Sequence, residues 1–187
     1  EEFFSLHDDE RWSRLLDTLN PRHEIYNDSL TKVLSHIYYN DQHYRTALDS
    51  VQAKFGWQSE QMRGLWKIIN YHDSLNLIQV EAILGKYGWL SRNQVGSDGS
   101  QALWLVIQHA DLSIQEKYLP VMRQAAESGK ASKRDLAYLI DRVLMRQGKK
   151  QLYGSQYQTD YKTGQTKLYD VEDPQNLNSR RESMGLP

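Results

Sequence analysis

The chain of 187 residues contains no cysteine, which excludes disulfide bonds, thiolate metal sites and a cysteine nucleophile. It has no apolar run near the ~20 residues that a membrane-spanning helix needs. Its 23 basic residues nearly balance 24 acidic ones, and the net charge of −1 gives no overall attraction to nucleic acid or anionic lipid. We therefore expect no nucleic-acid partner and no membrane span.

Several familiar catalytic patterns are also missing. The sequence has no glycine-rich phosphate loop, no His-Glu-x-x-His zinc helix and no Gly-x-Ser-x-Gly elbow. Asp73, His109 and Asp111 are the candidate ligands for a metal site, but a single histidine with scattered carboxylates does not form a metal-binding pattern. We expect no metal and no cofactor.

Most of the chain shows apolar residues at helical spacing, divided by capping residues and glycines. The predicted helices cover about 8–19, from 27 or 28 to 40, 41–55, from 59 onward, 75–87, 102–110, 113–128 and 132–148. Residues 91–100 are rich in Gly, Asn, Asp and Ser and predict a loop. Pro120 predicts that its helix either begins nearby or is kinked there.

The periodicity changes after Gln151. Residues 157–161, a turn at 162–164 and residues 165–171 predict a small β-hairpin, and Asp173-Pro174 begins a last helix over about 174–184. A lone hairpin is marginal in water, so we expect it to lie across the helices. The length fits one domain, 1–187. The predicted fold is mainly α, a compact orthogonal helical bundle with a short C-terminal β-hairpin at about 157–171.

The strongest functional signal is Gln108-His109-Ala110-Asp111, which follows an apolar helical run. Burying an amide, an imidazole and a carboxylate together is costly unless each finds a partner. If the helix continued, one stripe would hold Gln101, Gln108, Asp111 and Gln115.

Histidine is the side chain best suited to general acid–base work near neutral pH. His109 is therefore a candidate catalytic residue, with Asp111 as a second carboxylate. Two residues apart on one helix, they point in different directions and are not expected to pair. The alternative is a hydrogen-bonded network in the core.

Two other polar pairs are candidate binding residues. Asp41 and Arg45 stand four apart, a spacing that also permits an ordinary helix ion pair. Asp73 and Asn76 stand three apart at a predicted helix start, where Asp73 or Ser74 could simply be the cap.

Asp141 and Arg142 interrupt an apolar helical run, so one of them must lie near the core. Gln151, Tyr153 and Gln156 surround a glycine, and their amide and phenol groups could orient a polar ligand. The same groups could instead satisfy open backbone where helix gives way to strand.

These residues form an ordered set of motifs that resembles an uncharacterised bacterial family, described only as a domain of unknown function. The motifs are Asp41-Gln42-x-x-Arg45, Asp73-x-x-Asn76, Tyr87-Gly88-Trp89, Val95-Gly96, Gln108-His109-Ala110-Asp111, Gln115, Asp141-Arg142, Gln151-x-Tyr153-Gly154-x-Gln156, Arg180-Arg181 and Gly185-Leu186. Position 155 is Ser where the family usually has Thr. The resemblance implies that these polar residues recur and converge, and it supplies no reaction. Many similar proteins look exported, which favours a periplasmic or secreted location.

The leading hypothesis is a polar pocket that performs metal-independent hydrolysis, elimination or transfer on a small polar substrate. His109 would exchange the proton, Arg45 or Arg142 would hold an anion, and amide and phenol groups would orient the ligand. The rival hypotheses are a non-catalytic module that binds a ligand or peptide, and a purely structural network. The sequence leaves the substrate and the oligomeric state open.

Overall fold

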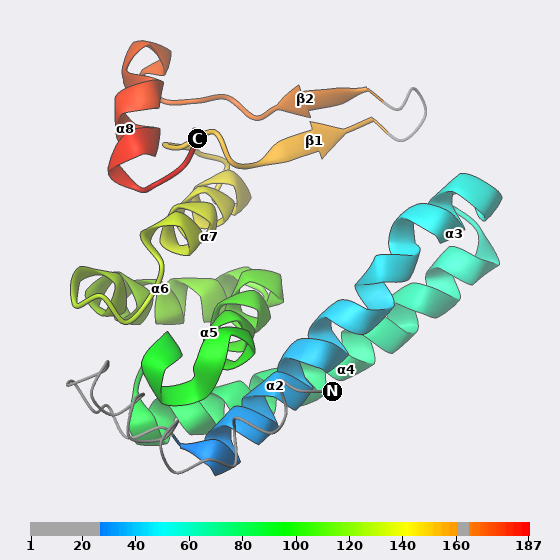
Figure 1. The fold of residues 1–187 in the computed structure, drawn as a ribbon. Helices are drawn as coiled ribbons and strands as arrows, with labels where there is room; N and C mark the ends of the chain where they lie inside the picture. Colours follow the sequence, from blue (N-terminus) through cyan, green and yellow to red (C-terminus); the bar gives the residue numbers. More distant parts are fainter. Residues whose placement is uncertain (1–26, 161–164) are drawn as a thin grey trace, which may run out of the picture.

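The computed structural model describes residues 27–160 and 165–187. The helix expected over 8–19 and the turn expected at 162–164 lie outside these ranges. Within them the chain is mostly helical and carries a short antiparallel hairpin near its C-terminal end, which confirms the predicted fold class (Figure 1).

The first described helices form a long antiparallel pair (Figure 1). One side consists of α2 (Asp28–His43), the 3-10 turn η2 (Tyr44–Ala47) and α3 (Leu48–Phe55), and the other side is α4 (Glu60–Tyr87). Asn27 caps α2 by accepting the Leu30 N–H at 3.0 Å, and Ser59 caps α4 by accepting the Met62 N–H at 3.1 Å. Both predicted helix starts are confirmed.

Two predicted breaks in this pair are wrong. The junction placed at residues 40–41 lies inside α2, and the break expected before Leu75 is absent because α4 continues through Asp73 and Ser74. Ser74 does not cap a helix, since its hydroxyl donates back to the Asn70 carbonyl at 2.8 Å, as a serine within a helix can do. Asp41 is buried among side-chain partners and does not end a helix.

The predicted loop at 91–100 is also wrong, because it forms the first turns of α5 (Arg92–His109). Ser91 and Gln94 make a capping box at its start. Gly96 has a φ of 74°, and this left-handed residue, which favours glycine, puts a kink into the helix.

Gly99 is a second glycine of residues 91–100 that has a role inside the helix. A Cβ at this position would lie 3.0 Å from the Val95 Cβ and 3.3 Å from the Leu34 Cβ. Glycine therefore lets α5 approach α2 closely, and a loop prediction based on composition misses this requirement.

The next helices, α6 (Leu112–Glu127) and α7 (Lys133–Arg146), pack against each other and against α5. Ser132 caps α7 as predicted, accepting the Asp135 N–H at 3.2 Å. A late start of α6 near Pro120 is wrong, because the helix begins at Leu112 and runs through the proline. Tyr118 and Met122 are buried on either side of Pro120, so packing offsets the missing backbone hydrogen bond.

The core lies where α2, α4, α5, α6 and α7 meet. Its fully buried apolar side chains include Leu34, Ile37, Val80, Leu103, Ile107, Met122 and Leu139. Burial of such side chains is the main stabilising contribution to the fold.

The C-terminal part begins with β1 (Tyr157–Thr159) and β2 (Thr166–Leu168), in which Tyr157 pairs with Leu168 and Thr159 with Thr166. The strands are shorter than predicted. Their residues are mostly exposed, so the hairpin does not lie across the helices as expected. The turn η3 (Pro174–Asn176) and α8 (Leu177–Ser183) follow, close to the predicted last helix. Among the described residues, no helix has the length and apolar character to cross a membrane.

Candidate functional site

His109 makes a hydrogen bond with a carboxylate that is distant in sequence. It is the last residue of α5, and its Nδ1 lies 2.9 Å from Oδ1 of Asp41, in the last turn of α2. The Asp41 side chain has no exposed surface, whereas the His109 side chain is 20% exposed. A buried carboxylate beside Nδ1 favours a proton on that nitrogen and leaves Nε2 to act as the acceptor.

The Asp41 carboxylate has further partners. Its Oδ2 accepts a 2.7 Å hydrogen bond from Nε2 of Gln42 and lies 4.0 Å from Nε of Arg45. Burial raises the pKa of Asp41, but the hydrogen bond and charge of His109, the charge of Arg45 and the Gln42 bond together lower it below its ordinary value. Asp41 is therefore ionised at neutral pH and available to stabilise an imidazolium.

Arg45 connects Asp73 to the contact between Asp41 and His109. Its guanidinium donates to Oδ2 of Asp73 at 2.9 Å and to the Asp41 carbonyl at 3.4 Å. The other Asp73 oxygen, Oδ1, is buried and has no partner among the described residues. We call Asp41, Arg45, Asp73 and His109 the His109 cluster; it is assembled from α2, η2, α4 and α5.

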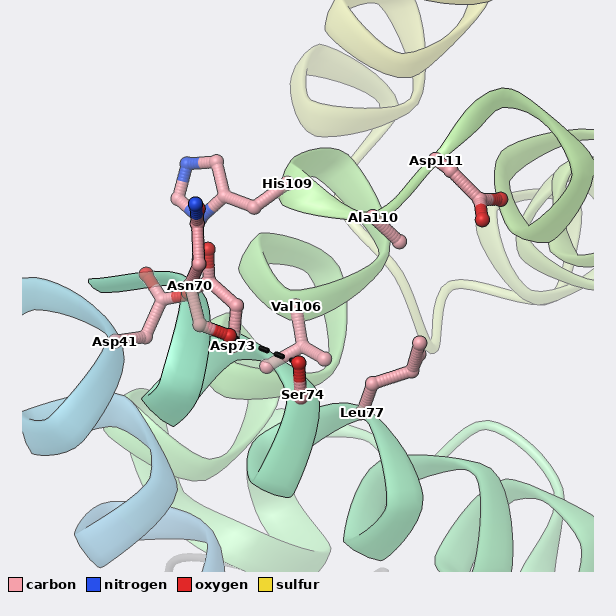
Figure 2. A pocket seen from close by; sticks show the side chains of 9 residues that line it. All are labelled: Asp41, Asn70, Asp73, Ser74, Leu77, Val106, His109, Ala110 and Asp111. Atoms are coloured by element: carbon pink, nitrogen blue, oxygen red, sulfur yellow. Dashed lines mark hydrogen bonds and ion pairs between the residues drawn. The ribbon is translucent and has the colours of Figure 1, made fainter. Parts of the chain in front are cut away.

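The His109 cluster borders a pocket of about 280 Å³. Figure 2 shows Asp41, Asn70, Asp73 and His109 gathered at one side of it. The lining residues are Asp41, Asn70, Asp73, Ser74, Leu77, Val106, His109, Ala110 and Asp111.

Five of these lining residues were not predicted as site residues: Val106 and Ala110 of α5 and, on α4, Asn70, Ser74 and Leu77. With Asp73 the three α4 residues follow the spacing of one helical face. A continuous α4 would have placed them together, but the predicted break near residue 74 separated them.

Asp111 stands apart from the other acids. It caps α6 by accepting the Ile114 N–H at 3.0 Å and the Ser113 hydroxyl at 2.8 Å, and these bonds lower its pKa. Its exposed carboxylate lies across the pocket and points away from His109 (Figure 2). As expected, the two residues do not pair; Asp41 fills the position beside the imidazole.

The predicted binding amides Asn76, Gln108 and Gln115 are buried and do not line the pocket. Gln115 donates to the Gln108 carbonyl at 2.8 Å, satisfying backbone at the C-terminal end of α5. The side-chain oxygens of all three have no partner among the described residues. The predicted stripe is broken, since α5 ends at His109 and Gln101 instead bonds Asp135 at 3.0 Å.

A second group of predicted residues holds the loop that follows α7. The fully buried Asp141 accepts from the backbone N–H groups of Leu152, Tyr153 and Ser155 at 2.7 to 3.1 Å and from the Ser155 hydroxyl at 2.9 Å. We call Asp141 and the loop 151–156 the Asp141 cluster.

Gln151 completes the Asp141 cluster from inside. Its amide donates to the carbonyls of Gln156 and Tyr169 at 3.1 and 2.8 Å, and its oxygen accepts the Gln156 N–H at 2.9 Å. Arg180 and Arg181 of α8 donate to loop carbonyls from the other side. The sequence left two alternatives for this segment, orienting a polar ligand or satisfying open backbone. Gln151 and Asp141 do the second, because their hydrogen bonds go to backbone groups of the loop.

Arg142 contacts the Asp141 cluster and does not line the pocket. It is largely buried, and Nε donates to Oε1 of Gln156 at 3.2 Å, yet no carboxylate among the described residues forms an ion pair with it. Burial lowers the pKa of Arg142, and the nearby charges of Arg146 and Arg45 lower it further. Arg146 itself donates to the Ala110 carbonyl, next to His109.

In residues 27–160 and 165–187, no three His, Asp or Glu side chains come close enough together to hold a metal ion. Comparison with known proteins gives one finding: a family model described as a family of unknown function (DUF6624) matches residues 31–187. No curated protein and no solved structure matches the chain.

Proposed function

The chain belongs to the DUF6624 family of unknown function, and we propose that it is a general acid–base enzyme acting on a small anionic substrate. His109 exchanges the proton, and Asp41 orients and stabilises its ring. The observation that carries the proposal is the 2.9 Å contact between a wholly buried carboxylate and a histidine at the wall of a pocket.

The geometry supports a defined division of roles. A proton held between Nδ1 and Asp41 leaves Nε2 free to remove a proton from water, from a substrate hydroxyl or, in an elimination, from a substrate carbon. The resulting imidazolium is stabilised by the ionised Asp41 and can return the proton to the leaving group. This exchange is common to hydrolysis, elimination and transfer, the three reaction classes that the proposal includes.

Buried positive charge supports an anionic substrate. Arg142 has no acidic partner among the described residues, and Arg45 and Arg146 are near enough to lower its pKa. Leaving a buried guanidinium without a counter-ion is costly, and a carboxylate or phosphate of the substrate would remove that cost. Arg142 is not among the residues that line the pocket, so its side chain would have to reach toward His109 to bind this anion beside the reacting bond.

The same unpaired Arg142 also favours a second candidate, a module that binds small anions without converting them. The two candidates predict the same effect of Arg142 on binding and differ only in turnover. His109 therefore decides between them.

The experiment is a turnover screen over phosphate esters, carboxylic esters and hydroxy acids. We expect His109→Gln to lower the rate of the discovered reaction by about 10²–10⁴, the usual contribution of general acid–base catalysis. Asp41→Asn should lower it as well while leaving substrate binding in place. The matched control is His36→Gln, which changes an exposed histidine of α2 and should retain the wild-type rate.

Nuclear magnetic resonance of the histidine nitrogens gives a readout that needs no substrate. A proton on Nδ1 of His109 that is lost or moved in Asp41→Asn supports the assigned roles, and added inorganic phosphate should shift the His109 signals. Full turnover by His109→Gln would overturn the catalytic role. Phosphate-dependent shifts without turnover of any compound would favour the binding module.

A further inference from the structure

α4 presents a second apolar face, away from the core. Its buried residues Met62, Ile69, Asn76 and Ile83 repeat every seven positions on the inner face. Roughly 150° around the helix, at 100° per residue, lies an exposed stripe. Its members are Gly64, Ile68, Tyr71, Leu75, Ile78, Ala82 and Gly85.

The spacing of this stripe alternates between four and three residues without interruption, which is the heptad pattern of a coiled-coil contact. The large side chains are well exposed: Ile68 by 44%, Tyr71 by 62%, Leu75 by 41% and Ile78 by 66%. Four large apolar side chains in one row form a contiguous patch, and such patches mark interaction sites more often than scattered apolar residues do. Gly64 and Gly85, near the two ends, have open space above their Cα atoms.

We propose that this stripe is a homodimer interface, in which α4 of two copies pack antiparallel around a twofold axis. The stripe is self-complementary in that arrangement. With Ile68 facing Ile78 of the second copy, Tyr71 faces Leu75 of the second copy, and every layer is apolar. The small residues Gly64 and Ala82 meet in the outer layer and allow close approach of the helices.

The flanking charges fit the same register. Lys67, beside the stripe, then faces Glu81 of the second copy, and by symmetry the pair occurs twice. Lys67 is exposed, and the hydrogen bonds that Glu81 accepts from Lys117 and Tyr118 both use Oε1, so Oε2 is available for Lys67. In a parallel in-register dimer Lys67 would face His72 instead, whereas Glu81 would face Lys86 of the second copy, so the crosslinking test below decides between the two forms.

The first test is the mass of the full chain over a concentration series, by sedimentation equilibrium. We expect twice the monomer mass of 21.9 kDa, and Ile78→Lys should return the protein to the monomer. The control is Val121→Lys, which places the same charge at an exposed apolar position of α6 and should remain dimeric.

Single cysteines test the geometry without interference, because the chain has none of its own. Ser74 faces its own counterpart across the axis, so Ser74→Cys should form a covalent dimer on mild oxidation. Ile68 should lie about 15 Å from its counterpart, ten residues along the helix, which is too far for a disulfide. Ile68→Cys should therefore not crosslink alone and should crosslink when mixed with Ile78→Cys.

Efficient crosslinking of Ile68→Cys alone would mean a parallel dimer and overturn the proposal. A monomer at every concentration would also overturn it. If Ile78→Lys then loses thermal stability, residues 1–26 of the same chain cover the stripe. If the wild-type monomer binds neutral lipid vesicles through Ile78, the stripe is a lipid-binding face.

Discussion

The His109 cluster and the Asp141 cluster are both polar groups in an otherwise apolar helical fold, yet they are satisfied in different ways. The Asp141 carboxylate accepts four donors from its own loop, and the amide of Gln151 has partners at both ends. In the His109 cluster, Nε2 of His109 and Oδ1 of Asp73 have no partner among the described residues.

Buried polar side chains can therefore have two roles in this fold, to stabilise a loop or to bind a ligand or a proton. A buried polar group whose hydrogen bonds are all made within the protein fixes a loop, and removing it costs stability. A group that is held at one end and open at the other is ready for a ligand or a proton. Arg142 has one bond, to Gln156, and no ion pair with an acid of the described residues.

The largest expected effect follows from breaking the closed cluster. Asp141→Asn would place an amide NH₂ toward backbone donors and leave buried N–H groups unpaired, at a cost of about 3 kcal/mol in the free energy of unfolding. Urea unfolding measures this cost. Ser155→Ala removes the hydroxyl that donates to Asp141 and accepts from Nε2 of Gln156, and it should cost about 1–2 kcal/mol. An Asp141→Asn protein as stable as the wild type would refute the structural role of this cluster.

Arg142→Met should affect binding more than stability. Removing an unpaired buried charge offsets the loss of the Gln156 contact, so the free energy of unfolding should stay within about 1 kcal/mol of the wild type. Phosphate binding, followed by calorimetry, should weaken by about tenfold, equivalent to the loss of one charge-assisted hydrogen bond. Arg142→Lys keeps the charge and should bind more tightly than Arg142→Met. Equal binding by all three proteins would place the anion elsewhere.

The acid stability of the protein tests Asp41. Because its pKa is lower in the folded protein, ionised Asp41 stabilises the fold above its ordinary pKa of 3.8. This contribution is lost as the pH falls through the still lower folded-state pKa. The stability gap between wild type and Asp41→Asn should therefore shrink as the pH falls below about 4. Asp49→Asn, at an exposed position of α3, is the control; a gap that widens in acid would contradict the assignment.

The smallest effect is expected at Asp111. Serine is as good an N-cap as aspartate, so Asp111→Ser should keep α6 and the melting temperature unchanged. Turnover should also be retained, in contrast to Asp41→Asn. If Asp111→Ser lost turnover while Asp41→Asn kept the wild-type rate, Asp111 and not Asp41 would be the carboxylate that supports catalysis.

Local pattern predicted the helical class, the caps at Asn27, Ser59 and Ser132, the hairpin and the polar residues that concern the site. It was wrong where one residue type serves two purposes. Gly96 and Gly99 suggested a loop because glycine is common in loops, but here one allows a kink and the other a close helix contact. Ser74 suggested a helix start, but it lies inside α4.

The sequence by itself determined which segments are helical and that His109 needs a partner, because helical periodicity and the cost of burying an imidazole are local properties. It could not show that the partner is Asp41, 68 residues away, or that Asp141 is enclosed by its own loop. Those outcomes depend on how α2, α4, α5 and α7 pack. Whether a buried polar atom is satisfied is decided by groups that only the tertiary structure brings within hydrogen-bond distance.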